Sequence, residues 1–140
     1  MTAMVAASRA RNWIRFQAAL DVTAGTALML LPLGWLARLP LPILPEEVSL
    51  LAVRMLGLYP AALAVCWVIA LRGGRLDPAA VRCGNGIRVL GGAALFLGAT
   101  LDEAAPWMLR GVCVGEWLFA VITLVLLRGV ERVREPVEGK

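Results

Sequence analysis

Four apolar stretches, each about 24 residues long, occupy most of this chain. They cover residues 13–36, 48–71, 78–101 and 106–130, and charged or proline-rich segments separate them. About 20 apolar residues let an α-helix cross a hydrocarbon layer ~30 Å thick. No stretch alternates polar and apolar residues with the period of two that is typical of strands. The pattern predicts an all-α, integral membrane, antiparallel four-helix bundle that forms one domain over residues 1–140, with a short cytoplasmic tail at 131–140.

The composition supports a membrane protein rather than a soluble one. Hydrophobic residues make up 60% of the chain and 14 glycines add to them, whereas apolar residues and glycine together reach about 45–50% in soluble domains. We therefore exclude a disordered or fibrous chain and do not expect a soluble domain.

Helix-breaking residues mark the ends of the stretches. Three prolines within 39–45 cannot continue a helix, because proline lacks an N–H and restricts the residue before it. Gly73-Gly74 is expected to end the second helix. Asp77 then precedes Pro78 as an N-cap before a first helical residue. Residues 102–106 are expected to form a short turn, which would make the third and fourth helices neighbours.

The basic residues predict the orientation. Ten of the 14 lie at one end of the expected bundle. Because basic loops stay on the cytoplasmic side, we expect both termini and the middle loop in the cytoplasm. Four tryptophans lie near expected helix ends, as an interfacial belt would place them: Trp13, Trp35, Trp67 and Trp107. The ten basic residues are Arg9, Arg11, Arg15, Arg72, Arg75, Arg82, Arg128, Arg132, Arg134 and Lys140.

Four charged residues lie inside the expected spans, namely Asp21, Arg54, Arg88 and Glu116. Each would cost about 2.5–3.5 kcal/mol unpaired at a helix centre, so we expect them to form an intramembrane charge cluster. The expected depths of these four residues in the bilayer favour the pairs Asp21–Arg88 and Glu116–Arg54. The pair Arg88–Glu116 is an alternative. The charges share helix faces with small residues, which allow close helix packing.

The cluster has more than one interpretation. The leading one is structural, with ion pairs that fix helix register and no ligand. In the alternatives, the cluster lines a site for a proton, a quinone, a lipid headgroup or a small substrate, or it binds the membrane helix of a partner.

Missing residue types limit the chemistry. The chain has no histidine, which removes imidazole ligation and most general-base mechanisms. Three cysteines without a C-x-x-C spacing indicate neither a disulfide framework nor a zinc site. We expect no catalytic residue, no metal, no cofactor and no nucleic-acid partner.

Each stretch carries a short motif around its charge: Asp21-x3-Gly25 followed by Leu31-Pro32, Arg54-x2-Gly57-Leu58-Tyr59, Gly86-Ile87-Arg88, and Glu116-Trp117-x-Phe119. Together these motifs resemble the DoxX-like families of small four-helix bacterial membrane proteins, many of unknown function. The resemblance covers most of the chain. It implies a four-helix membrane fold, and it permits a partnership with quinone-reducing or redox assemblies, as described for named relatives.

A second comparison is with the small multidrug transporters, which have four helices and an essential acid in the first. Asp21 would be that acid. Two arginines inside the spans oppose a cation site, however. The sequence also lacks the aromatic residues that surround the essential acid in that family.

The function expected from the sequence is therefore non-catalytic. We expect an accessory or structural subunit of a larger inner-membrane assembly, with an electron-transfer complex as one example. Its partners would be the lipid bilayer and other membrane subunits or further copies of the chain. The alternative is a small transporter or a quinone- or lipid-binding protein that uses the charge cluster as its site.

Overall fold

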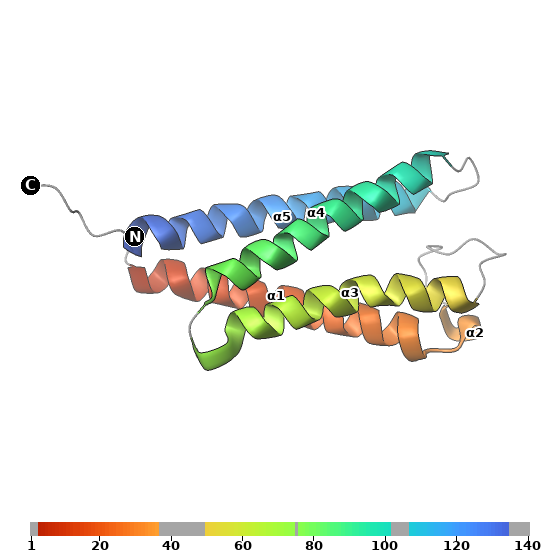
Figure 1. Ribbon diagram of the computed structural model, residues 1–140, viewed down its shortest axis with the longest axis horizontal. Helices are drawn as coiled ribbons and strands as arrows, with labels where there is room; N and C mark the ends of the chain where they lie inside the picture. The colour runs from red at the N-terminus through yellow and green to blue at the C-terminus, as the bar shows by residue number, and fades with distance from the viewer. Residues whose placement is uncertain (1–2, 37–49, 75, 102–106, 135–140) are drawn as a thin grey trace, which may run out of the picture.

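The computed structural model describes residues 3–36, 50–74, 76–101 and 107–134. These residues form four long helices, a one-turn helix and a short 3-10 turn. Figure 1 shows two antiparallel pairs, α1 with α3 and α4 with α5, lying along one axis. The predicted all-α four-helix fold with antiparallel neighbours is confirmed. The elements are α1 (Ala3–Leu30), α2 (Leu33–Leu36), α3 (Leu50–Leu71), η1 (Arg72–Gly74), α4 (Pro78–Leu101) and α5 (Trp107–Arg134).

Local signals explain the turn between α3 and α4. Gly73 adopts a positive φ of 75°, a conformation that side chains with a Cβ rarely take, and α3 ends there as expected. Asp77 is the N-cap of α4, because its Oδ1 accepts a hydrogen bond of 2.9 Å from the backbone N–H of Ala79. Pro78 occupies the first helical position, where no N–H is needed.

The helix limits agree with the sequence for α4 and differ most for α1, which ends at Leu30, before the separate helix α2, although the apolar stretch predicted one helix as far as residue 36. α4 spans the predicted residues 78–101, whereas α1 begins at Ala3 rather than near residue 13. Hydropathy locates only the apolar part of a helix. The first turns of α1 contain Arg9 and Arg11, and the helical hydrogen bonds continue through them.

The four long helices stand at the corners of a square. α1 packs on α3, α3 on α4, α4 on α5, and α5 on α1. The pairs α1–α4 and α3–α5 therefore lie across the two diagonals. The backbones of α1 and α3 approach closely at Gly25, where an added Cβ would lie 3.1 Å from the amide nitrogen of Ala61.

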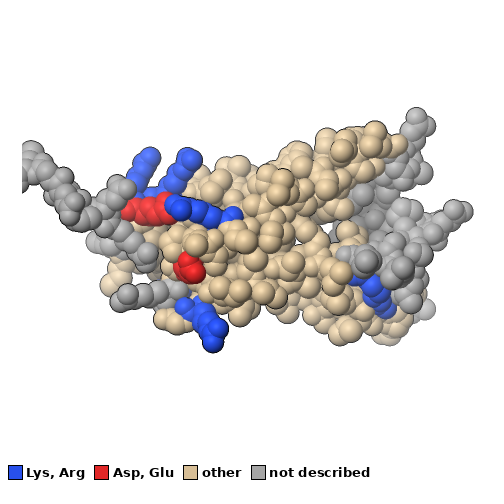
Figure 2. Space-filling model, viewed as in Figure 1, with Lys and Arg blue, Asp and Glu red and all other residues tan. Residues whose placement is uncertain are grey.

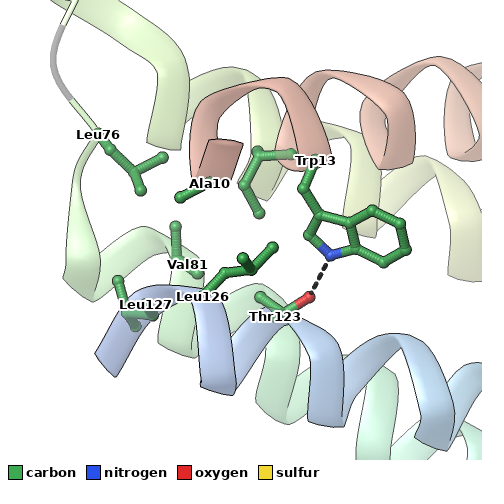
Figure 3. A pocket seen from close by; sticks show the side chains of 8 residues that line it. Ala10, Trp13, Leu76, Val81, Thr123, Leu126 and Leu127 are labelled. Carbon is green, nitrogen blue, oxygen red and sulfur yellow. Dashed lines mark hydrogen bonds between the residues drawn. The ribbon is translucent and has the colours of Figure 1, made fainter. Parts of the chain in front are cut away.

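Apolar packing is concentrated at the end where α1 begins and α5 ends. We call this the basic end, because Arg9, Arg11, Arg15, Arg72, Arg82, Arg128 and Arg132 lie on its helix turns. Figure 3 shows apolar side chains from α1, α4 and α5 meeting there, together with Leu76. Val81 and Ile14, each 1% exposed, lie in this core, and the hydrogen bond of Trp13 to Thr123 borders it.

Large apolar side chains are exposed on the outer faces of the helices. Leu90 is 73% exposed, Val125 62% and Val65 58%, and further large aliphatic side chains are exposed on each long helix. Within the described residues, one segment, Arg110–Arg132 of α5, is long and apolar enough by itself to cross a membrane. Leu56–Leu71 of α3 is a shorter apolar segment. A crossing by all four helices stays a prediction.

Candidate functional site: a buried ionic network

Arg88 of α4 forms ion pairs with two acids. Its side chain is 1% exposed; Nη2 lies 2.6 Å from Asp21 Oδ2, and Nη1 lies 2.6 Å from Glu116 Oε2. The predicted pair Asp21–Arg88 is confirmed, and the alternative pair Arg88–Glu116 is also present. One guanidinium therefore bonds α4 to both α1 and α5.

Two aromatic side chains of α3 complete the coordination of the acids. The indole Nε1–H of Trp67 donates to Asp21 Oδ2 over 2.7 Å. The hydroxyl of Tyr59 lies 3.1 Å from Glu116 Oε2 and 3.1 Å from the carbonyl oxygen of Arg88. A hydroxyl has one proton, so Tyr59 donates to one of these oxygens at a time. Each carboxylate thus faces Arg88 and one aromatic donor.

These contacts involve both diagonals of the square. Arg88–Asp21 connects α4 with α1, and Tyr59–Glu116 connects α3 with α5, although neither helix pair packs side by side. We call Asp21, Tyr59, Trp67, Arg88 and Glu116 the ionic network. Because its members come from four helices, the network fixes the relative height of all of them.

Glycines of α4 make room for the aromatic members. A Cβ added to Gly84 would lie 2.9 Å from the ring of Trp67, and one added to Gly91 would overlap the ring of Tyr59. The aromatic rings of α3 therefore lie against the backbone of α4. They do so on the face of this third predicted helix where small residues were expected.

Arg54 lies outside the network, so the predicted pair Glu116–Arg54 is wrong. Its Nη1 donates to the carbonyl oxygen of Leu28 over 2.6 Å, and its Nη2 donates to that of Leu31 over 2.8 Å. In a helix, the carbonyl of Leu28 would accept from residue 32. That residue is Pro32, which has no N–H, so Arg54 supplies the missing donor at the end of α1.

Aromatic rings border the buried guanidinium. The Cζ atom of Arg88 lies 5.4 Å from the ring centroid of Phe119 and 5.7 Å from that of Trp67. Cations within about 6 Å of an aromatic centroid are attracted to the ring face, more strongly when they are desolvated. These rings therefore help to hold a charge that little water reaches.

A layer of neutral polar residues lies between the network and the basic end, and the sequence reasoning missed it. Thr123 Oγ1 accepts hydrogen bonds from Trp13 Nε1 over 3.0 Å and from Gln17 Nε2 over 2.9 Å. Asn85 Nδ2 donates to the carbonyl oxygen of Ala120 over 3.3 Å. Gln17 is four residues before Asp21 and Asn85 is three before Arg88, so helical spacing from the charges was an available signal.

This interior contains polar atoms that lack a partner. Within the described part of the chain, Gln17 Oε1, Asn85 Oδ1 and Arg88 Nε are buried and make no hydrogen bond. Gln17 is fully buried and Asn85 is 4% exposed. Buried polar atoms are usually satisfied, so these three show that hydrogen bonding in this part of the interior is incomplete.

The tryptophans predicted to form an interfacial belt differ in burial and in their contacts. Trp67 is fully buried, so its predicted place in an interfacial belt is wrong. Trp13 is part-buried and bonds Thr123. Trp35 is 64% exposed, as a belt residue would be. The side chain of Trp107 lies outside the described residues.

The network contains two carboxylates and one guanidinium. With all three ionised, their charges leave one negative charge in excess, and the Glu116 side chain, 17% exposed, is the most accessible of them. Across the described ranges, no three His, Cys, Asp or Glu side chains gather as metal ligands would. The arrangement can lock the four helices together, and its excess charge can attract a cation.

Comparisons with known proteins add no family: no protein-family model, curated protein or solved structure matches this chain.

Proposed function

We propose that the chain is a non-catalytic integral membrane protein whose four long helices cross the bilayer and whose ionic network fixes the bundle. In this proposal it serves as an accessory or structural subunit of a larger membrane assembly. The observation that carries the proposal is the distribution of polarity. Ionic and amide side chains lie inside, with Arg88 at 1% exposure, while Leu90 and Val125 point outward.

That distribution suits hydrocarbon surroundings better than water. The largest apolar patch of a soluble monomer is about 300–600 Å². Here, large aliphatic residues more than half exposed occur on four long helices, among them Leu30, Val65, Leu90 and Val125. An ion pair is favoured in the interior of a bundle, since a charge facing lipid has no partner.

The basic residues support a single orientation. Figure 2 shows that most of the arginine side chains on this face gather at the basic end. At that end, Arg82 also pairs with Glu131 over 2.6 Å and links α4 to α5. The positive-inside rule assigns the basic end to the cytoplasm, at a bacterial inner membrane.

An accessory role is favoured by what the chain offers to a partner. The described residues outside the helices are few. On α5, Gly111 and Gly115 are four residues apart, and an added Cβ at either would meet no atom within 4 Å. Small residues at this spacing let membrane helices approach closely, which suits contact with another subunit or another copy of the chain. The proposal that the assembly is an electron-transfer complex depends only on the resemblance to the DoxX-like families.

Membrane residence and orientation are tested by thiol labelling in intact cells. Single cysteines are placed at Ser8 and Ala79 near the basic end and at Gly34 and Thr100 near the other end, after the native cysteines are replaced. We expect a membrane-impermeant maleimide to label only the positions at Gly34 and Thr100. Labelling of all four positions, or loss of the protein from membranes in alkaline carbonate, would contradict the proposal.

The accessory role is tested by extraction in a mild detergent, followed by size analysis and mass spectrometry. Other membrane subunits are expected to co-purify in a fixed ratio. A free monomer or dimer without other subunits would contradict that role and leave membrane residence intact.

The excess negative charge of the network favours a second candidate function, a small transporter or ligand-binding protein. In this alternative Glu116, the most exposed charged member, contacts a quinone, a lipid or a cationic substrate. A Glu116→Gln variant that stays folded and loses binding or transport would favour this alternative over the accessory role.

A further inference from the structure

An apolar groove of about 310 Å³ runs along the outside of the α1–α3 pair. Small residues form its floor, with Gly25 on α1 and Ala61 and Ala64 on α3, while Met29 and Leu30 line its sides. A second, shallow hollow lies on the adjoining face of α1 and shares Val22, Thr26 and Leu30 with the groove. Both hollows lie within helices that we propose to be in the bilayer.

Arg54 lies just beyond this groove, toward the end of the molecule opposite the basic end. It precedes Ala61 by seven residues, which is two helical turns or roughly 10 Å along the same face of α3. Its two hydrogen bonds go to the carbonyls of Leu28 and Leu31, which flank the groove residues Met29 and Leu30. The guanidinium of Arg54 therefore lies next to one end of the groove on the same surface.

The charge of Arg54 has no carboxylate partner among the described residues, where the ion pairs join other side chains. Backbone carbonyls supply only dipoles. A guanidinium has five N–H donors, so two carbonyl bonds leave donors for a further acceptor. A phosphate oxygen is the acceptor that suits it best, since Arg–phosphate pairs are charge-assisted and often bidentate.

We propose that this face binds an anionic phospholipid, with the headgroup phosphate at Arg54 and one acyl chain in the groove over Gly25 and Ala61. The proposal assumes the membrane location argued above and is independent of any partner subunit. An acyl chain gains little by leaving other acyl chains, because both surroundings are apolar. The selectivity for lipid charge must therefore come from Arg54, and the groove determines where the chain lies.

The test is native mass spectrometry of the purified full-length chain in detergent, with phosphatidylglycerol and phosphatidylcholine of identical acyl chains added in equal amounts. We expect wild type to retain phosphatidylglycerol about fivefold over phosphatidylcholine, because one basic residue near an anionic lipid contributes a factor of that order. Arg54→Gln should abolish the preference and Arg54→Lys should keep it. Arg82→Gln, which removes the same charge at the basic end, should leave it unchanged.

The groove is tested separately, because Arg54→Gln also removes donors from the end of α1. Thr26 is exposed and lines both hollows, so Thr26→Phe should fill the groove and lower lipid retention severalfold. Leu90→Phe, at an exposed position on α4, should not. Millimolar inorganic phosphate should not displace the lipid, since it has no acyl chain.

Each of the following results would overturn the proposal: equal retention of both lipids by wild type, an unchanged preference in folded Arg54→Gln, or full retention in Thr26→Phe. Displacement by inorganic phosphate would also overturn it, in favour of a plain anion site. All of these outcomes are compatible with a chain that stays in membranes after carbonate extraction. Failure of this proposal is therefore distinguishable from failure of the proposed function.

Discussion

The guanidinium of Arg88 bonds the carboxylate of Asp21 across a diagonal of the bundle, over 2.6 Å, between helices that do not pack side by side. A contact between two neighbouring helices still allows one helix to rotate about the groove where the two pack. A contact across a diagonal fixes the separation of the two helix pairs. The hydroxyl of Tyr59 meets Glu116 across the other diagonal, so the height and spacing of all four helices depend on one small group of side chains.

The first prediction concerns the charge balance of the network. Arg88→Met leaves Asp21 and Glu116 without a cation in a water-poor interior, and removal of one partner from a buried ion pair typically destabilises by about 3–5 kcal/mol. Glu116→Gln leaves the balanced pair Asp21–Arg88, so we expect a much smaller loss. The free energy of unfolding, measured in mixed micelles with increasing denaturing detergent, tests this order.

The triple variant Asp21→Asn, Arg88→Met, Glu116→Gln serves as the control. It has no charge in the network, so it should be more stable than Arg88→Met alone. If Glu116→Gln were as damaging as Arg88→Met, the unequal charge count would not govern stability.

The second prediction concerns Gly91, whose missing side chain leaves room for Tyr59. Gly91→Ala places a methyl group where the Tyr59 ring lies, so the ring must shift and its hydroxyl must leave Glu116. Overpacking of this kind costs about 1–3 kcal/mol. Gly98→Ala is the matched control on α4, because its Cβ would meet no atom within 4 Å and alanine favours a helix by about 0.5–1 kcal/mol. Thermal unfolding in detergent should separate the two variants, and equal melting temperatures would contradict the packing of Tyr59 on α4.

The sequence was informative about the helices and about one ion pair, for physical reasons. Span length and helix breakers are local properties, so α4 could be predicted to the residue from Asp77, Pro78 and the apolar run that follows. The pair Asp21–Arg88 followed from opposite charges at similar depth. Arg54 could not be assigned, since depth along a helix does not reveal which way a side chain turns. Pro32, which removes a donor four residues after Leu28, was the signal for its true partner.

Trp67 was misjudged for a related reason. A tryptophan near a helix end suits a membrane interface, and only the rotation of α3 in the folded bundle turns its indole toward Asp21. Tyr59 likewise reaches Glu116 only through the rotation of α3. The rotation of each helix depends on its packing against the other three, so the sequence of one helix does not reveal it.

The third prediction compares the buried Trp67 with the exposed Trp35. Trp67→Phe keeps most of the ring volume and removes the Nε1–H that donates to Asp21. Interhelical hydrogen bonds in membrane proteins average about 0.6 kcal/mol and reach about 1.7, and we expect a loss near the upper value because the acceptor is charged. Trp35→Phe, at a side chain that is 64% exposed, should change the free energy of unfolding little. Equal effects of the two substitutions would show that the bond to Asp21 contributes nothing.

The fourth prediction tests the polar layer between the network and the basic end. Thr123 Oγ1 accepts from both Trp13 and Gln17 and donates to the carbonyl of Phe119 over 2.7 Å. Thr123→Val keeps the shape but leaves two donors without an acceptor, and an unsatisfied buried group costs about 1–3 kcal/mol. Thr123→Ser retains the hydroxyl and loses one methyl group, so it should be the milder change. The comparison is made by thermal unfolding in detergent. A valine variant that is more stable than the serine variant would mean that shape at this position matters more than the hydrogen bonds, and that Trp13 and Gln17 find other acceptors.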